Sequence, residues 1–257
     1  MFEVAMALFA FVFGAMVGSF LNVVIYRLPL DKSVVSPPSS CPACGARIRA
    51  WQNIPIVSYL MLGGKCSNCK VSISPRYPLV EASMGLLSLG AWLNFGPGVA
   101  FASAFVFLAG LLAMTFIDID HKIIPDSISL GGIIAGFAFS FWIGVGWKDS
   151  LFGILLGGGS LLAVALGYWL LTRREGMGMG DVKLLAAIGA FLGWRAVLFT
   201  VFAASLSGSV AGIVVMRMKG ADGKFEVPFG PFLALGAALY LFWGEAVIGW
   251  YYAYSGF

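Results

Sequence analysis

Two aspartates at the ends of separate apolar segments are the residues most able to do chemistry in this sequence. Asp118 directly follows an unbroken apolar run, and Asp181 ends the glycine-rich stretch Gly176-Met177-Gly178-Met179-Gly180-Asp181. A charged carboxylate is costly to place beside apolar helices, so acids in such positions usually serve a function. Two neighbouring acids can share a proton and act as general acid and general base. Asp118 and Asp181 are therefore candidates for carboxylate-pair catalysis.

The glycines before Asp181 remove side-chain bulk, so we expect another backbone, from the protein or a substrate, to approach closely. The glycine pattern superficially resembles a dinucleotide-binding fingerprint, but no preceding strand or βαβ unit accompanies it, and that interpretation is rejected. Asp120 is the nearest rival to Asp118 for the catalytic role, and spacing alone does not separate them.

All four cysteines form two C-x-x-C pairs, and the residues are Cys41, Cys44, Cys66 and Cys69. Each pair can hold one ion with two thiolates, so the two pairs predict a tetrahedral structural zinc site. The surrounding insert, residues 28–78, has little core of its own, and a metal could supply its folding energy. Two disulfides or a redox pair are the alternatives. A reducing cytoplasm, where the topology below places the insert, disfavours standing disulfides.

The composition indicates a membrane protein. Hydrophobic residues make up 60% of the 257 residues, charged residues make up 11%, and the mean hydropathy is +0.93, which does not suit a soluble globule. We predict an all-α polytopic membrane protein with about eight transmembrane helices, at 4–26, 79–95, 98–117, 127–146, 150–172, 184–193, 196–216 and 229–250. The sixth is too short to cross alone, which indicates a half-helix or a helix shielded by protein.

These segments divide the chain into three predicted parts. They are a first transmembrane helix (1–27), a cytoplasmic zinc-binding loop (28–78) and a transmembrane helical core (79–257). With the amino terminus outside, fourteen of the sixteen Lys and Arg residues lie in inner loops, and only Lys148 and Arg195 lie outside. This bias predicts that the loop and both aspartates are at the cytoplasmic side. The net charge of +4 thus reflects topology; no basic face suggests nucleic-acid binding.

Several other polar residues have competing interpretations. Asn22 forms a helix-to-helix hydrogen bond or contacts a substrate. Glu81, near the beginning of a helix, balances the helix dipole or has a functional role. Asp126 is expected to cap the helix that follows it. Lys183 pairs with Asp181 or anchors the chain at the membrane interface.

Taken together and in order, these motifs make the chain similar to the bacterial type IV prepilin peptidases, also called prepilin leader peptidases/N-methyltransferases. The resemblance covers nearly the whole chain. It rests on the two C-x-x-C pairs and on Gly18-Ser19-Phe20-Leu21-Asn22-Val23, Arg27-Leu28-Pro29, Asn53-Ile54-Pro55, Arg76-Tyr77-Pro78 with Glu81, Ile117-Asp118, Ile124-Pro125-Asp126, Gly178-Met179-Gly180-Asp181-Val182-Lys183 and Pro228-Phe229-Gly230-Pro231-Phe232. The Gly178–Asp181 segment resembles the G-x-G-D motif of membrane aspartic proteases.

The resemblance implies two activities at the bacterial inner membrane. One is removal of the short basic leader from prepilins or pseudopilins of type IV pili or type II secretion systems. The other is methylation of the new amino terminus with S-adenosylmethionine as donor. By position, the resemblance makes Asp118 and Asp181 the catalytic pair and the four cysteines the zinc ligands. No S-adenosylmethionine-binding residues can be assigned.

Two other classes of function use the same residues. A proton-coupled transporter could use the membrane acids as a proton relay, although such acids are expected near mid-membrane. A membrane thiol oxidoreductase could use the C-x-x-C pairs, and it would need reactive, oxidisable cysteines.

Overall fold

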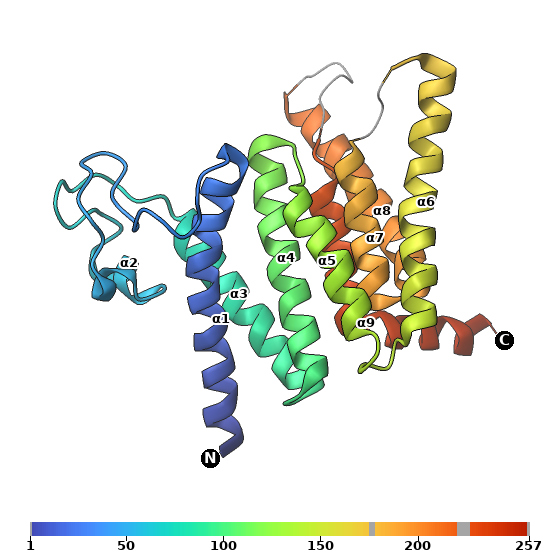
Figure 1. The fold of residues 1–257 in the computed structure, drawn as a ribbon, viewed down its shortest axis with the longest axis horizontal. Coiled ribbons are helices and arrows are strands. Elements are labelled where there is room, and N and C mark those ends of the chain that lie inside the picture. The colour runs from blue at the N-terminus through green and yellow to red at the C-terminus, as the bar shows by residue number, and fades with distance from the viewer. Residues whose placement is uncertain (1, 175–177, 220–226, 256–257) are drawn as a thin grey trace. The chain divides into compact units, whose positions relative to one another are not determined.

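The structure is a computed structural model that describes residues 2–174, 178–219 and 227–255. Within these residues the chain forms long helices, named α1 (Phe2–Arg27), α3 (Arg76–Phe95), α4 (Val99–His121), α5 (Asp126–Phe139), α6 (Trp147–Thr172), α7 (Met179–Leu192), α8 (Trp194–Lys219) and α9 (Gly230–Ser255) (Figure 1). Between α1 and α3 lie only the short helices η1 (Leu28–Leu30), η2 (Ala50–Asn53) and α2 (Val57–Met61). The described residues contain two isolated β-bridges and no strand, which confirms the all-α class.

Five of the described helices, namely α1, α4, α6, α8 and α9, are long and apolar enough to cross a membrane. The chain is therefore a multi-pass membrane protein. Helices α5 and α7 have 14 residues each and extend about 21 Å, less than the roughly 30 Å of a bilayer core. The structure thus supports five of the eight predicted spans by length and composition.

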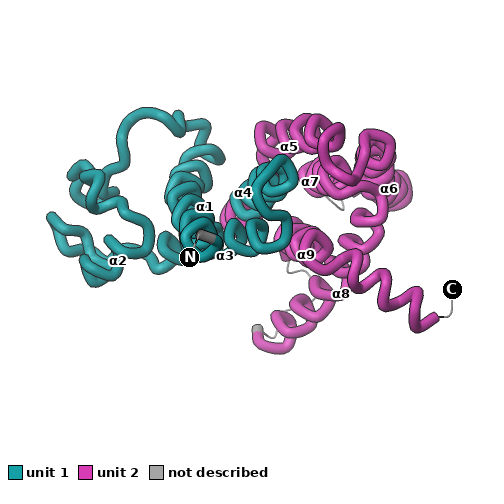
Figure 2. Tube along the Cα trace, turned by 90° about the horizontal axis from the view of Figure 1, so that it is seen from below, with its two compact units in different colours: residues 1–113 teal, residues 114–257 magenta. Residues whose placement is uncertain are grey.

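The contacts divide the chain into two compact units, Met1–Ala113 and Met114–Phe257, with the boundary inside α4 (Figure 2). In the first unit, α1 packs along α3. A Cβ atom at Gly18 would lie 2.8 Å from the Cα atom of Glu81, so a small residue is needed there for the two helices to approach. The Asn22 side chain donates a hydrogen bond to the Tyr77 carbonyl (3.1 Å), which confirms the helix-to-helix interpretation.

Helix α7 is the most enclosed element of the second unit. It packs against α5, α6, α8 and α9, and every residue from Leu184 to Phe191 is buried. A helix that is apolar all round needs such enclosure. The short sixth segment is therefore a helix shielded by protein, one of the two forms expected from its length.

Glycines let the backbones of α6 and α7 touch. A Cβ atom added at Gly189 of α7 would collide with the Gly153 backbone of α6, and one at Gly157 would collide with the Leu185 carbonyl. The Ser150 hydroxyl also donates to the Ala190 carbonyl (2.7 Å) across the same interface. By contrast, Gly159 faces open space. Gly153 and Gly157 thus form the small-residue face typical of membrane helix pairs.

This contact makes Gly189→Ala destabilising. The added methyl group must push the two backbones apart, which we expect to cost about 1–3 kcal/mol and to lower the thermal midpoint measured in detergent. Gly159→Ala is the matched control, because its methyl group meets no neighbour and alanine favours a helix. Equal midpoints for the two variants would contradict the packing described here.

Candidate functional site

Asp118 is the buried acid near the carboxyl-terminal end of α4. Its exposed fraction is 6%, whereas Asp120 and His121 are exposed. One carboxylate oxygen, Oδ2, accepts a hydrogen bond from the backbone N–H of Gly230 (3.1 Å). Burial and this backbone contact therefore distinguish Asp118 from Asp120, which spacing in the sequence does not.

Gly230 is the first residue of α9, and its lack of a side chain is required. A Cβ atom there would lie 2.6 Å from Asp118 Oδ2 and 3.2 Å from Ile124 Cδ1. The first N–H groups of a helix have no partner within the helix, so a carboxylate is a favourable acceptor for them. No local pattern in the sequence indicates this role for Gly230, although the Gly230-Pro231 step at the beginning of the last span marks the position.

Asp181 lies in the first turn of α7 and is half-buried. Burial raises the pKa of its carboxyl group to about 6, and the negative charge of Asp118 adds to the rise. The contacts of Ile124 show that the two acids lie at neighbouring helix ends. A Cβ atom at Gly180 would lie 2.9 Å from Ile124 Cβ. Ile124 thus packs against Gly180 beside one acid and Gly230 beside the other.

The three glycines before Asp181 do not act alike. Gly176 and the adjacent Met177 lie outside the described residues. Gly180 admits a close approach, but the group that approaches is Ile124 of the same chain. Gly178 is exposed, and among the described residues a Cβ atom there would meet no atom nearer than 3.9 Å. Of the two described glycines, Gly178 is therefore the one with room for another backbone.

Three of the other sequence interpretations need correction. The N-cap of α5 is Pro125, so Asp126 is the first residue of the helix and not its cap; its side chain pairs with Lys183 of α7 at 2.6 Å. Lys183 thus neither pairs with Asp181 nor acts only as an interface anchor.

Glu81 is the sixth residue of α3, beyond the first turn where the helix dipole acts. Its carboxylate accepts the backbone N–H of Ile56 at 2.7 Å.

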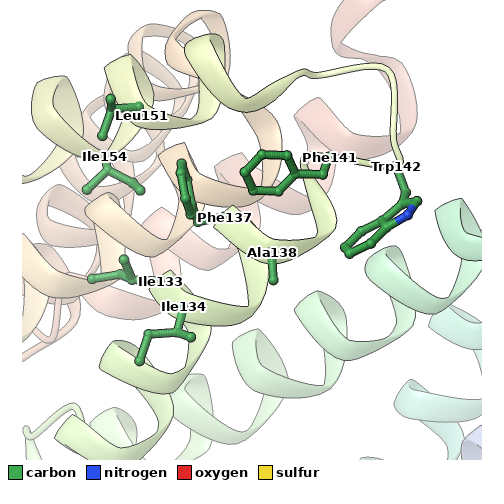
Figure 3. Close-up of a pocket in the computed structure, with 8 residues that line it drawn as sticks. All are labelled: Ile133, Ile134, Phe137, Ala138, Phe141, Trp142, Leu151 and Ile154. Atoms are coloured by element: carbon green, nitrogen blue, oxygen red, sulfur yellow. The ribbon is translucent and has the colours of Figure 1, made fainter.

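An apolar groove elsewhere in the second unit has no comparable chemistry. It is lined by side chains of α5, α6 and the connection between them, including Phe137, Phe141, Trp142 and Leu151 (Figure 3). None of its eight lining residues is titratable. The chemistry of this unit therefore belongs to the helix ends that carry the acids.

The four cysteines come together in the insert of the first unit. All are free thiols, and their Sγ atoms all lie within 4.8 Å of one another. The Cys41 and Cys69 sulfurs are 3.9 Å apart. Tetrahedral zinc with bonds of about 2.3 Å would place its sulfurs about 3.8 Å apart. The cluster thus fits a metal ion held by four thiolates.

The two cysteine pairs share one backbone fold. In the first, the Cys41 N–H donates to the Ala46 carbonyl (2.9 Å); in the second, the Cys66 N–H donates to the Val71 carbonyl (2.8 Å). The fourth residue after each leading cysteine has a positive φ, Gly45 at 69° and Lys70 at 61°. Glycine adopts this conformation readily at Gly45. At Lys70 the same turn forces a non-glycine residue into an uncommon conformation.

The thiols cannot all ionise easily without a cation. The Ala46 backbone N–H and then the Asn68 side chain lower the pKa of Cys44 to about 6. The N–H of Val71 favours the Cys69 thiolate, yet burial and the neighbouring cysteines outweigh it and raise the pKa of that thiol to about 11. A divalent cation removes this conflict because it stabilises every thiolate at once.

Comparison with known proteins identifies the family of this chain. The model of the bacterial peptidase A24 N-terminal domain matches residues 12–95, and that of the type IV leader peptidase family matches residues 105–213. The prepilin leader peptidase/N-methyltransferase of Pseudomonas aeruginosa is 39% identical over 98% of this chain and 96% of its own length. The Stutzerimonas stutzeri protein of that name is 40% identical, over 98% and 95%. No solved structure matches significantly. The chain belongs to the type IV leader peptidase family.

Proposed function

We propose that this protein is a membrane aspartic endopeptidase that removes the leader peptide of prepilins or pseudopilins and then N-methylates the new amino terminus. The family and the names of the full-length relatives support both activities. The observation that carries the peptidase proposal is the convergence of Asp118 and Asp181 around Ile124.

In the proposed reaction the two acids share one proton. Two neighbouring carboxyl groups cannot both ionise cheaply. We place the proton on Asp181, whose pKa is raised to about 6 by burial and by Asp118. Asp118 removes a proton from water, which attacks the peptide carbonyl, while Asp181 protonates the carbonyl oxygen. The open space at Gly178 would let an extended substrate backbone pass beside the pair.

We further propose that the acids work at the cytoplasmic face of the inner membrane. In this topology the carboxyl-terminal end of α4 and the amino-terminal end of α7, which carry the two acids, lie at the cytoplasmic side. The excess of Lys and Arg in loops on one side supports the orientation. A leader peptide rich in basic residues stays on that side, so its cleavage site would meet the acids there.

The cysteine cluster is proposed to hold one structural zinc ion. Four thiolate ligands leave no open coordination position, which is typical of a structural rather than a catalytic site. The proposed methyl donor is S-adenosylmethionine, which would supply a methyl group to the amine released by cleavage. The described residues do not identify the site that binds it.

The first prediction concerns the acid pair. Asp118→Asn and Asp181→Asn each remove a group needed for proton transfer, so each should lower cleavage of a prepilin-like peptide with a basic leader by at least about 10³-fold. Asp120→Asn is the matched control on α4 and should keep near-normal cleavage, since Asp120 is exposed. Normal cleavage by either of the first two variants, in correctly inserted protein, would refute the pair.

The second prediction concerns pH. A general acid works only while protonated, so the rate must fall as pH rises through its pKa. Because burial raises the pKa of Asp181 to about 6 from an ordinary 3.8, kcat/KM should decline on the alkaline side with a midpoint at about pH 6 or higher. A decline centred near pH 4 would show that the acid has an ordinary aspartate environment.

The third prediction concerns the metal. Cys41→Ser removes one of four ligands and should reduce bound zinc, measured by elemental analysis, from about one ion per chain to well below one. It should also speed proteolysis within residues 28–78, whose order depends on the ion. Ser40→Ala, next to Cys41 and exposed, is the control. Unchanged zinc in Cys41→Ser would rule out four-cysteine ligation.

A further inference from the structure

We infer that Lys183 and Asp126 form a positioning pair that holds Asp181 in place for cleavage. The inference rests on the proposed function and concerns two residues that have no part in the proposed proton transfers. Lys183 Nζ lies 2.6 Å from Asp126 Oδ1. The bond joins the second turn of α7 to the first residue of α5.

The pair is one of two contacts between the amino-terminal end of α7 and residues 124–126. The other is the packing of Ile124 against Gly180. On α7 the contact residues, Gly180 and Lys183, stand on either side of Asp181 in the sequence. The body of α7 is held by α5, α6, α8 and α9, whereas these two contacts act on the turn that carries Asp181. We therefore expect the pair to set the position of that turn.

The connector also reaches the other acid. It follows α4, which ends three residues after Asp118, and Ile124 packs against Gly230, whose N–H holds the Asp118 carboxylate. A shift of the connector would therefore change the placement of Asp181 relative to Asp118. Misplacement of reacting groups by about 1 Å can cost roughly 100-fold in rate.

Local contacts do not replace this pair. The N-cap residues of α7 and α5 are Gly178 and Pro125, whose side chains cannot form a capping hydrogen bond. The partner that the structure gives the Asp126 carboxylate is Lys183. Residues 181 and 183 are two apart in a helix and do not face each other, which explains why Lys183 reaches α5 instead of the neighbouring acid.

The exposure of the pair argues for positioning over stability. The side chains of Lys183 and Asp126 are 28% and 62% exposed, and ion pairs in contact with water contribute little to unfolding free energy. Loss of the pair should therefore leave the fold intact while it disturbs the acids. This separates a positioning role from a merely structural one.

The test is a double-mutant cycle on cleavage of a prepilin-like peptide by the full chain. Lys183→Met and Asp126→Asn should each lower kcat by about 10- to 100-fold, with KM within threefold of the original and an unchanged thermal midpoint. The double variant should be no slower than the slower single variant, because both changes break one contact. Lys183→Arg keeps the charge and should restore most of kcat.

The controls separate the possible failures. Lys148→Met removes a positive charge from the outer end of α6 and should leave kcat unchanged. If the unaltered protein cleaves and Asp181→Asn does not, the proposed function stands. Normal kcat in Lys183→Met, or losses that multiply in the double variant, would then overturn the positioning pair alone. A rise in KM without a fall in kcat would overturn the positioning pair as well, because it would indicate that these residues contact the substrate.

Discussion

Ile124 packs between two glycines, and the candidate active site depends on this contact. Gly180 precedes one acid, and Gly230 donates its N–H to the other. The residue thus joins the carboxyl-terminal end of α4 to the amino-terminal ends of α7 and α9. Close packing tolerates no added methyl group at either glycine. Apolar contacts thus fix the helix ends that carry the two carboxylates.

The positions of the chemical groups could be predicted from the sequence, because each group is of a type that is unusual in its local sequence. An acid after an apolar run and paired cysteines in a membrane protein are expensive or reactive unless they have a use. The sequence also indicates that Gly178 and Gly180 allow a close approach because they lack side chains, but only the structure separates their roles. The short segment 184–193 could likewise be identified as unable to cross alone, and its enclosure in the second unit explains its apolar surface.

The sequence could not reveal contacts between residues that are far apart along the chain. Gly230 and Asp118 are 112 residues apart, and Lys183 and Asp126 are 57 apart. Local rules made a cap the expected role of Asp126, but tertiary packing placed a lysine within reach of it. The position of Glu81 near the beginning of a helix suggests that it balances the helix dipole. Its partner in the structure is instead the backbone N–H of Ile56, which belongs to the insert. Periodicity carries no information on such pairings.

A structure of the protein bound to a peptide whose cleaved bond is replaced by a hydroxyl-bearing isostere would test the central claim most directly. The hydroxyl group of such a ligand takes the place of the attacking water. We predict that it lies within hydrogen-bond distance, about 2.6–3.2 Å, of carboxylate oxygens of both Asp118 and Asp181. A hydroxyl group bound by only one of them, with the other acid out of reach, would contradict the shared site.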